Sequence, residues 1–309
     1  MGDTISSLLF QPPPPTKLKA EKVIWLESRR GIKVPAFYIS YSNIDGVDVS
    51  RSLTLEQVKK SRPTEGITVL YSHANAEDLG SIYPWCKYLS RMLHVNLMAY
   101  DYAGYGMAYD QGPPSEKHCY ADIEAAYDFL RNTLRVPATN IVLYGRSLGS
   151  GPSCHLAAGK SQLKEPVGGV ILHAPFLSVF RIVLDSGCTL IGDKFPNIDL
   201  VPMIESPILF VHGTADQIVP VYHSQQLHSA VQKNCRVEPL FIDGMTHNNV
   251  HVAVRQLFIS RLMDFLEKNI IPHASIEKSE NTLKVKLKYS NRKKTDECET
   301  SPNILELQQ

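Results

Sequence analysis

The sequence predicts an α/β protein with a mostly parallel central sheet and helices on both faces of that sheet. The first observation is a series of short apolar runs separated by segments with helical spacing, a pattern typical of strands buried on both faces. The second is the composition: 43% hydrophobic and 20% charged residues are ordinary for a globular protein and argue against collagen, coiled coils and wholesale disorder. The predicted strands are Ile67–Tyr71, Val95–Tyr100, Ile141–Tyr144, Val170–His173, Ile208–Val211 and Val237–Ile242.

A pair of antiparallel strands is expected before these strands. Pro12–Pro15 can only be extended, because proline fixes φ and has no N–H to donate. Lys22–Leu26 and Val34–Ser40 are expected to pair as two strands that turn at Arg30-Gly31. The polar stretch 42–65 has little apolar periodicity, so we expect a long loop there with at most one short helix.

Two segments have the spacing of amphipathic helices. Apolar residues recur three or four apart between Glu116 and Leu134, and again near the end of the chain. We expect both helices to pack on the sheet. Their apolar residues are Cys119, Ile123, Tyr127, Leu130 and Leu134 in the first helix, and Val250, Val254, Leu257, Phe258, Leu262 and Phe265 in the second.

The length of 309 residues fits one full-sized α/β domain with tails. We expect an N-terminal extension over residues 1–20, the α/β domain over 21–271, and a polar, basic, disordered tail over 272–309. The net charge of +1 gives the chain no overall positive charge of the kind that binds nucleic acid. The six cysteines are scattered without a C-x-x-C pair, which argues against a zinc site and predicts reduced thiols in a cytosolic protein.

The sharpest motif is Gly145-Arg146-Ser147-Leu148-Gly149, which follows a predicted strand and opens into a helix-like segment. A G-x-S-x-G sequence in this context predicts a tight strand-to-helix turn that lifts the serine hydroxyl clear of the sheet. Glycines are needed on either side of the serine because side chains there would collide with neighbouring backbone. Ser147 is therefore the candidate nucleophile.

A serine nucleophile needs a histidine base and an acid that orients the histidine. In this sequence Asp216 follows the predicted strand that ends at Val211, and His247 follows the next one. Because parallel strands end at the same edge of a sheet, we expect Ser147, Asp216 and His247 to meet there. Asp243 is the alternative acid, and His212 and His251 are the alternative bases.

An oxyanion hole needs backbone N–H groups beside the serine. The predicted strand ending near Ser72 is followed by His73-Ala74-Asn75, so the N–H groups of Asn75 and Leu148 are the candidates. His73 is expected to hold this loop by hydrogen bonds rather than to act as a base. The chemistry predicted for these residues requires no metal and no organic cofactor.

Six motifs in order resemble the serine hydrolases called alpha/beta hydrolase domain-containing protein 17. The resemblance covers residues from about 9 to about 270 and implies the α/β-hydrolase fold. It also implies removal of palmitate from cysteine thioesters on membrane-associated proteins, with S-acylated proteins as partners. The motifs are His73–Gly80, Asp101–Gly106, Leu143–Gly149, Asp193–Ile198, His212–Asp216 and Gly244–Asn248.

This sequence departs from the family at two places. Ala74 stands where the family's oxyanion loop usually has glycine, and its methyl group is expected to shift the Asn75 N–H. The N-terminal cysteine cluster that anchors those proteins by palmitoylation is absent, since the first cysteine is Cys86. Met1-Gly2 with Ser6 matches the myristoylation motif instead and would allow a lipid on Gly2, the alternative being an ordinary terminus.

Membrane attachment at the cytosolic face, of the plasma membrane or of endosomes, is the expected location. The chain has no run of about 18 apolar residues and no secretory signal, so neither a spanning helix nor secretion is supported. One myristoyl chain binds membranes only marginally, so the basic residues from Lys284 to Lys294 are the candidate second signal. The membrane surface is thus a predicted partner.

Only 34 residues separate His173 from Ile208, which is too few for a large lid and predicts an open site. The apolar side chains of this stretch are candidates for an acyl groove, although core packing is the alternative for most of them. Two other functions use the same residues or the same fold: an esterase or lysophospholipase acting on oxygen esters, and a non-catalytic binding module. The candidate groove residues are Leu177, Phe180, Ile182, Val183 and Leu190.

Overall fold

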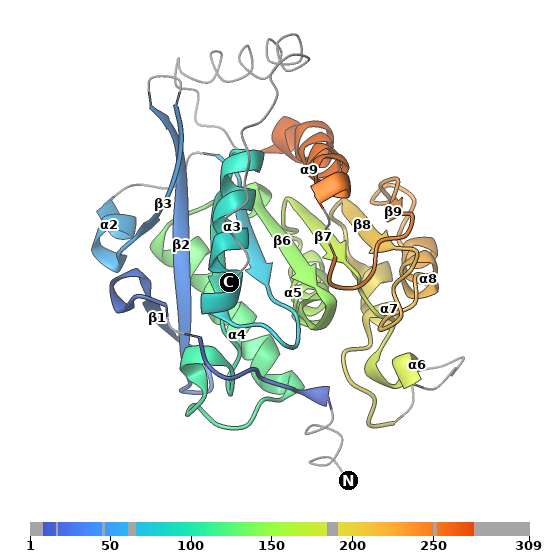
Figure 1. Ribbon diagram of the computed structural model, residues 1–309, viewed down its shortest axis with the longest axis horizontal. Helices are drawn as coiled ribbons and strands as arrows, with labels where there is room; N and C mark the ends of the chain where they lie inside the picture. Colours follow the sequence, from blue (N-terminus) through green and yellow to red (C-terminus); the bar gives the residue numbers. More distant parts are fainter. Residues whose placement is uncertain are drawn as a thin grey trace. The chain divides into compact units, whose positions relative to one another are not determined.

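A mixed sheet with helices packed on both faces forms the centre of the protein (Figure 1). The computed structural model describes residues 9–16, 18–44, 47–60, 66–183, 191–249 and 252–274. The chain divides into two units, Met1–Ser275 and Ile276–Gln309, and every described residue belongs to the first unit. Gly2, Ser6, Leu190, His251 and the basic run 284–294 lie outside the described residues.

The sheet has nine strands within the described residues, in the order β1-β2-β5-β4-β6-β7-β8-β9, with β3 paired to β2. Neighbours from β5 to β9 are parallel, whereas β2 is antiparallel to β1, β3 and β5. This arrangement is the mostly parallel sheet that the apolar runs predict. The strands are β1 Ile24–Glu27, β2 Lys33–Ile44, β3 Val47–Leu53, β4 Thr68–Ser72, β5 Asn96–Tyr100, β6 Ile141–Arg146, β7 Gly169–His173, β8 Ile208–Gly213 and β9 Leu240–Ile242.

Each face of the sheet has its own hydrophobic core, because successive side chains of a strand point to opposite faces. Leu70 and Leu143 pack in the core that contains residues of α4 and α5, whereas Val69 and Val142 pack with residues of α3 and α9. Helices therefore cover both faces of the parallel strands. The helices are α2 Leu55–Lys60, α3 Leu79–Leu93, α4 Glu116–Asp128, α5 Ser150–Gln162, α6 Val179–Val183, α7 Asn197–Leu200, α8 Tyr222–Ala230 and α9 Val252–Phe265.

Both predicted helices are present, but Leu257 is 53% exposed and so does not belong to the packed face of the second helix. Val250 lies outside the described residues. Helix α4 continues as one π-helical turn, Phe129–Thr133, and α9 continues in the same way as Leu266–Ile270. No helix in the described ranges is long and apolar enough to cross a bilayer. The four cysteines within these ranges, Cys86, Cys119, Cys154 and Cys235, are buried free thiols.

The prediction of a long loop over 42–65 is wrong for most of that stretch. Strand β2 continues to Ile44, and β3 pairs with it from Val47 to Leu53, followed by the one short helix α2. Among the described residues β3 pairs with β2 alone, at the edge of the sheet, so it tolerates polar residues that a buried strand would exclude. At the opposite edge the predicted strand from Val237 shortens to β9, Leu240–Ile242.

Candidate active site

Ser147 lies at the sharp turn after β6, where the 3-10 turn Ser147–Gly149 begins and leads directly into α5. Its φ of 49° is in the left-handed region, where a side chain is strained, as expected for a turn that projects a serine from the sheet. The flanking glycines are required by contact: a Cβ on Gly149 would lie 2.1 Å from the carbonyl oxygen of Ser72. A Cβ on Gly145 would lie 2.5 Å from the carbonyl oxygen of Gly149.

The structure brings Ser147, His247 and Asp216 together at the carboxyl edge of the sheet. His247 Nε2 lies 3.0 Å from Ser147 Oγ, and His247 Nδ1 lies 2.6 Å from Asp216 Oδ2. With Nδ1–H donating to the carboxylate, Nε2 is free to accept the serine proton. The geometry is that of an activated serine nucleophile.

Asp216 is held as a carboxylate by four donors. Its Oδ1 accepts the N–H groups of Ile218 and Val219, both at 2.9 Å. Its Oδ2 accepts His247 and also His212 Nε2, which lies at 3.2 Å. Burial raises the pKa of Asp216, but the hydrogen bonds from His212, His247 and Val219 outweigh burial, so its pKa is lowered overall.

The alternative acid and bases take other places. Asp243 accepts the hydroxyl of Thr214 at 2.9 Å, whereas His247 Nδ1 pairs with Asp216. His212 is buried, and its Nε2–H also donates to the carbonyl oxygen of Val219 at 2.8 Å. It therefore helps to hold Asp216 in place, whereas His247 contacts Ser147 as a base would. His251 lies outside the described residues.

The loop after β4 contributes Ala74 and Asn75 to the wall of the cavity. Nδ1–H of His73 donates to the Ala74 carbonyl oxygen at 2.8 Å, which is the loop-holding contact that the sequence predicts for His73. Burial lowers the pKa of His73, which favours its neutral form. Ala74 keeps a negative φ, so the backbone at this position does not require glycine. Asn75 and Leu148 both line the cavity beside Ser147.

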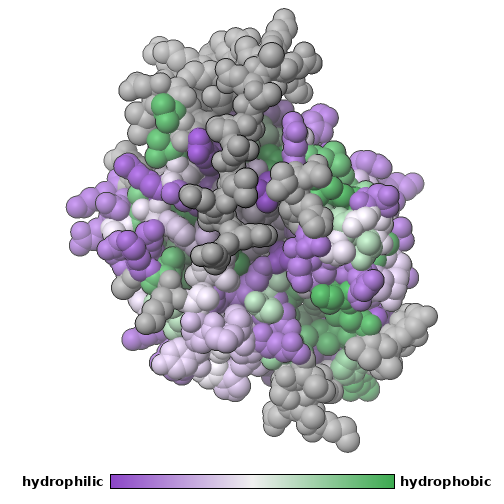
Figure 2. All heavy atoms as spheres, viewed as in Figure 1, coloured by the Kyte–Doolittle hydropathy of each residue, from purple (hydrophilic) through white to green (hydrophobic). Residues whose placement is uncertain are grey.

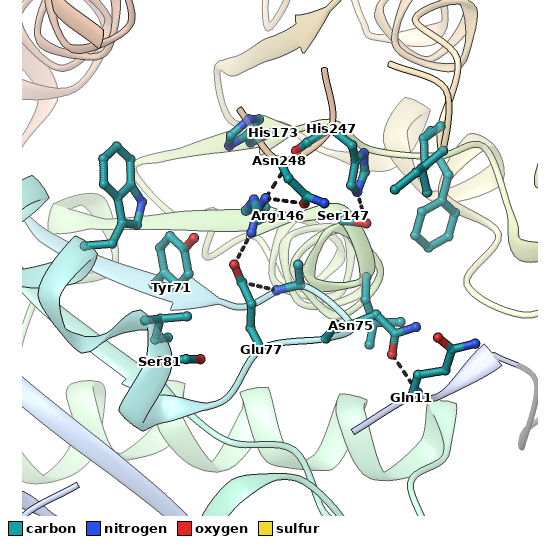
Figure 3. A pocket seen from close by; sticks show the side chains of 18 of the residues that line it. Gln11, Tyr71, Asn75, Glu77, Ser81, Arg146, Ser147, His173, His247 and Asn248 are labelled. Atoms are coloured by element: carbon teal, nitrogen blue, oxygen red, sulfur yellow. Dashed lines mark hydrogen bonds and ion pairs between the residues drawn. The ribbon is translucent and has the colours of Figure 1, made fainter. Parts of the chain in front are cut away.

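A charged network beside the serine was not anticipated from the sequence. Arg146 pairs with Glu77, and its second terminal nitrogen donates to the His247 carbonyl oxygen at 3.2 Å and to Asn248 Oδ1 at 3.1 Å. Figure 3 shows Arg146 between Glu77 and Asn248. Both Glu77 and Arg146 lie inside the motifs quoted above, but nothing in the sequence indicates that they form a pair.

The cavity at Ser147 has a volume of about 690 Å³. Its apolar wall includes Leu148, Phe176, Ile182 and Ile218. Figure 2 shows apolar surface near α6 and the neighbouring loops, and Ile218 is 56% exposed. Of the predicted groove residues, Ile182 lines the cavity.

Two of the predicted groove residues do not line the cavity. Leu177 packs in the core instead, and Phe180 is not part of the cavity wall. The side chain of Val183 lies outside the described part of the chain, as does Leu190.

Curated relatives cover most of the chain. An alpha/beta hydrolase domain-containing protein of Caenorhabditis elegans, aho-3, is 33% identical over 270 residues, which is 85% of this chain and 77% of the relative. The human alpha/beta hydrolase domain-containing protein 17B is 37% identical over 210 residues, or 68% of this chain and 69% of the relative. The chain belongs to the alpha/beta hydrolase domain-containing protein 17 family. No protein-family model matches the chain.

Solved structures confirm the α/β-hydrolase fold of this family member. The esterase Pf2001 of Pyrococcus furiosus superposes with a TM-score of 0.61 at 15% identity, covering 84% of this chain and 98% of the esterase. Est1E of Butyrivibrio proteoclasticus superposes with a TM-score of 0.58 at 15% identity, covering 80% of this chain and 99% of Est1E. Family and fold together make this chain a hydrolase.

Proposed function

We propose that this hydrolase removes palmitoyl groups from cysteine thioesters on membrane-associated proteins, with Ser147 as nucleophile. One observation carries the proposal: Ser147 Oγ lies 3.0 Å from His247 Nε2, and both face a cavity with an apolar wall. The family resemblance of the sequence supports the thioester as the bond that is cleaved.

In the first half of the reaction, Ser147 Oγ attacks the thioester carbonyl carbon while His247 Nε2 takes the serine proton. The carbonyl oxygen becomes an oxyanion that the N–H groups of Asn75 and Leu148 stabilise. Asp216 accepts Nδ1–H and stabilises the imidazolium. When the C–S bond breaks, His247 returns the proton to the departing cysteine sulfur, and the acyl group remains on Ser147 as an ester.

In the second half, His247 takes a proton from a water molecule as the water oxygen attacks the acyl ester. Breaking the bond to Ser147 Oγ releases the fatty acid, and the proton on His247 returns to the serine. The starting enzyme is restored, and one water molecule is consumed in each turnover.

The two parts of the substrate fit two different walls of the cavity. Phe176, Ile182 and Ile218 offer an apolar surface suited to an acyl chain. Arg146, Glu77 and Asn248 lie together beside Ser147 and offer a polar surface that suits the peptide part (Figure 3). Only short helices lie between β7 and β8 in the described residues, namely α6, α7 and the 3-10 turn Val201–Met203, which supports access by a bulky protein substrate.

The proposal includes attachment to the cytosolic face of membranes, where S-acylated proteins are found. The sequence supports this with the myristoylation motif at Gly2 and the basic run from Lys284 to Lys294. Attachment would hold the enzyme near its substrates and compensate for weak recognition of each peptide.

The test compares hydrolysis of a palmitoylated cysteine peptide with that of the same peptide carrying palmitate on serine. We expect a larger kcat/KM for the thioester, and loss of both activities in Ser147→Ala. Labelling by a fluorophosphonate probe shows independently whether the serine is activated. Preference for the oxygen ester would assign an esterase instead, and an unlabelled, inactive wild-type protein would assign a binding module.

A further inference from the structure

The N-terminal segment Leu9–Thr16, here called the strap, lies against the loop that presents the Asn75 N–H. The carbonyl oxygen of Leu9 accepts Asn75 Nδ2–H at 2.6 Å, and the backbone N–H of Gln11 donates to Asn75 Oδ1 at 3.0 Å. The hydroxyl of Tyr105 donates to the same Oδ1 at 2.5 Å. Figure 3 shows Asn75 turned toward Gln11. The side-chain amide of Asn75 is therefore held on both of its polar atoms.

The strap is anchored at two further residues, Phe10 within this contact and Thr16 at the end of the strap. Phe10 is only 5% exposed and meets the ring of Phe195 edge-on, with ring centroids 6.2 Å apart. At the other end, the N–H of Thr16 donates to Asp78 Oδ2 at 2.6 Å, and its hydroxyl donates to Asp78 Oδ1. Asp78 also caps α3, so this end of the strap is fixed to a helix.

The proline run makes the strap stiff between these anchors. Pro12–Pro15 restrict the unfolded chain to extended conformations, so docking costs less conformational entropy than it would for a flexible segment. A stiff, doubly anchored segment can transmit a fixed position to the group it contacts. That group is Asn75.

Leu9 and Gln11 also line the cavity that contains Ser147. The strap is thus both a wall of the cavity and a contact of the oxyanion loop. We propose that it is a positioning element of the active site, which holds Asn75 so that its backbone N–H faces the developing oxyanion. This inference rests on the proposed function, because the oxyanion exists only if Ser147 attacks a carbonyl.

A positioning role for the strap predicts a different effect on kcat and KM than a purely structural role does. The Asn75 N–H interacts more strongly with the oxyanion than with the ground-state carbonyl, so losing its position lowers kcat and leaves KM for a small substrate nearly unchanged. Complete loss of one oxyanion donor costs about 10² to 10³ in kcat, and a displaced donor should cost about tenfold.

The experiment uses a short-chain soluble ester and compares a chain that begins at residue 12 with a control that begins at residue 8. We expect about a tenfold fall in kcat for the first and wild-type kcat for the control. Asn75→Ala in the full chain removes the side-chain contacts but keeps the backbone N–H, and should lower kcat similarly. Combining it with the longer truncation should cause no further loss, because both changes break the same contact.

Thermal unfolding of each variant shows whether it is folded. If the longer truncation fails to fold, Asn75→Ala and Phe10→Ala in the full chain test the same contact. Wild-type kcat in the truncated or Asn75→Ala protein, or losses that multiply in the combined variant, would overturn the inference. An inactive wild-type protein would instead contradict the proposed function, so the two failures are distinguishable.

Discussion

The guanidinium of Arg146 forms an ion pair with the carboxylate of Glu77, and this pair joins the end of β6 to two loops around Ser147. The other oxygen of Glu77 accepts the Ala74 N–H at 2.9 Å, next to the oxyanion loop peptide. Arg146 in turn reaches the carbonyl oxygen of His247 at 3.2 Å. One charged contact thus links the residue before the nucleophile, the oxyanion loop and the loop of the base.

Breaking this pair should slow catalysis without abolishing it. We expect Glu77→Gln and Arg146→Gln each to lower kcat by about tenfold, because small displacements of reacting groups are costly. The double variant should be no slower than the worse single one, since both changes remove the same interaction. Steady-state kinetics on a soluble ester measures these effects.

Lys164→Gln is the matched control for the Arg146 variants, because Lys164 pairs with Glu205 at 2.9 Å on the exposed surface. We expect it to leave kcat unchanged. Wild-type kcat in Glu77→Gln and Arg146→Gln would show that the pair does not position the loops.

Substitutions of Ser147 and of Asp216 should lower kcat by different amounts. Ser147→Ala should lower kcat by up to about 10⁶-fold, and Asp216→Asn by about 10⁴-fold, since the amide favours the wrong tautomer of His247. Circular dichroism and thermal unfolding should show folded proteins in both cases. A Ser147→Ala enzyme with near-wild-type turnover would remove Ser147 from the mechanism.

The buried carboxyl of Asp122 should make stability depend on pH. Burial raises its pKa to about 7, although the N–H of Ala103 counters this by donating to Oδ2 at 2.9 Å. Because an aspartate in the unfolded chain has a pKa of about 3.9, the folded protein holds this proton more tightly. The contribution of Asp122 to the free energy of unfolding should therefore decrease as pH rises from about 4 to about 7.

Asp122→Asn has no proton to lose, so its stability should fall less over this range than that of the wild type. Urea unfolding at about pH 5 and about pH 7.5 measures the difference. Burial also raises the pKa of Asp101 to about 7, so part of the slope should remain. Asp110→Asn on the exposed surface is the control. If the free energy of unfolding changed equally with pH in the wild type, Asp122→Asn and Asp110→Asn, the raised pKa of Asp122 would be refuted.

Membrane attachment should need two signals. One myristoyl chain binds with K of roughly 10⁴ M⁻¹, and each cation near an anionic leaflet adds about 1 kcal/mol. We expect Gly2→Ala and a chain truncated after Pro272 each to shift the enzyme from the membrane fraction to the soluble one. Equal membrane fractions in both variants and the wild type would refute two-signal attachment.

The parallel strands and the order of site residues could be predicted because their signals are local. A buried strand such as β6 must be apolar, and the glycines at 145 and 149 are required by close backbone contacts. Strand β3 was missed because an edge strand can be polar, and its pairing with β2 depends on register rather than on periodicity.

The contacts that hold the site could not be predicted, because they join residues far apart in sequence. Glu77 and Arg146 are 69 residues apart, and Gln11 and Asn75 are 64 apart. The prolines indicate that the strap is extended, but not where it docks. Only the folded chain shows that Leu9 and Gln11 reach the cavity of Ser147.

The central claim is that a palmitoyl group passes through an ester on Ser147. Wild-type enzyme mixed with a palmitoylated cysteine peptide and quenched in acid within the first turnover can be examined by mass spectrometry. We expect a palmitoyl adduct on the peptide that contains Ser147, together with one free thiol per adduct, and no adduct in Ser147→Ala. Release of thiol and fatty acid without an adduct on Ser147, or an adduct on another residue, would contradict it.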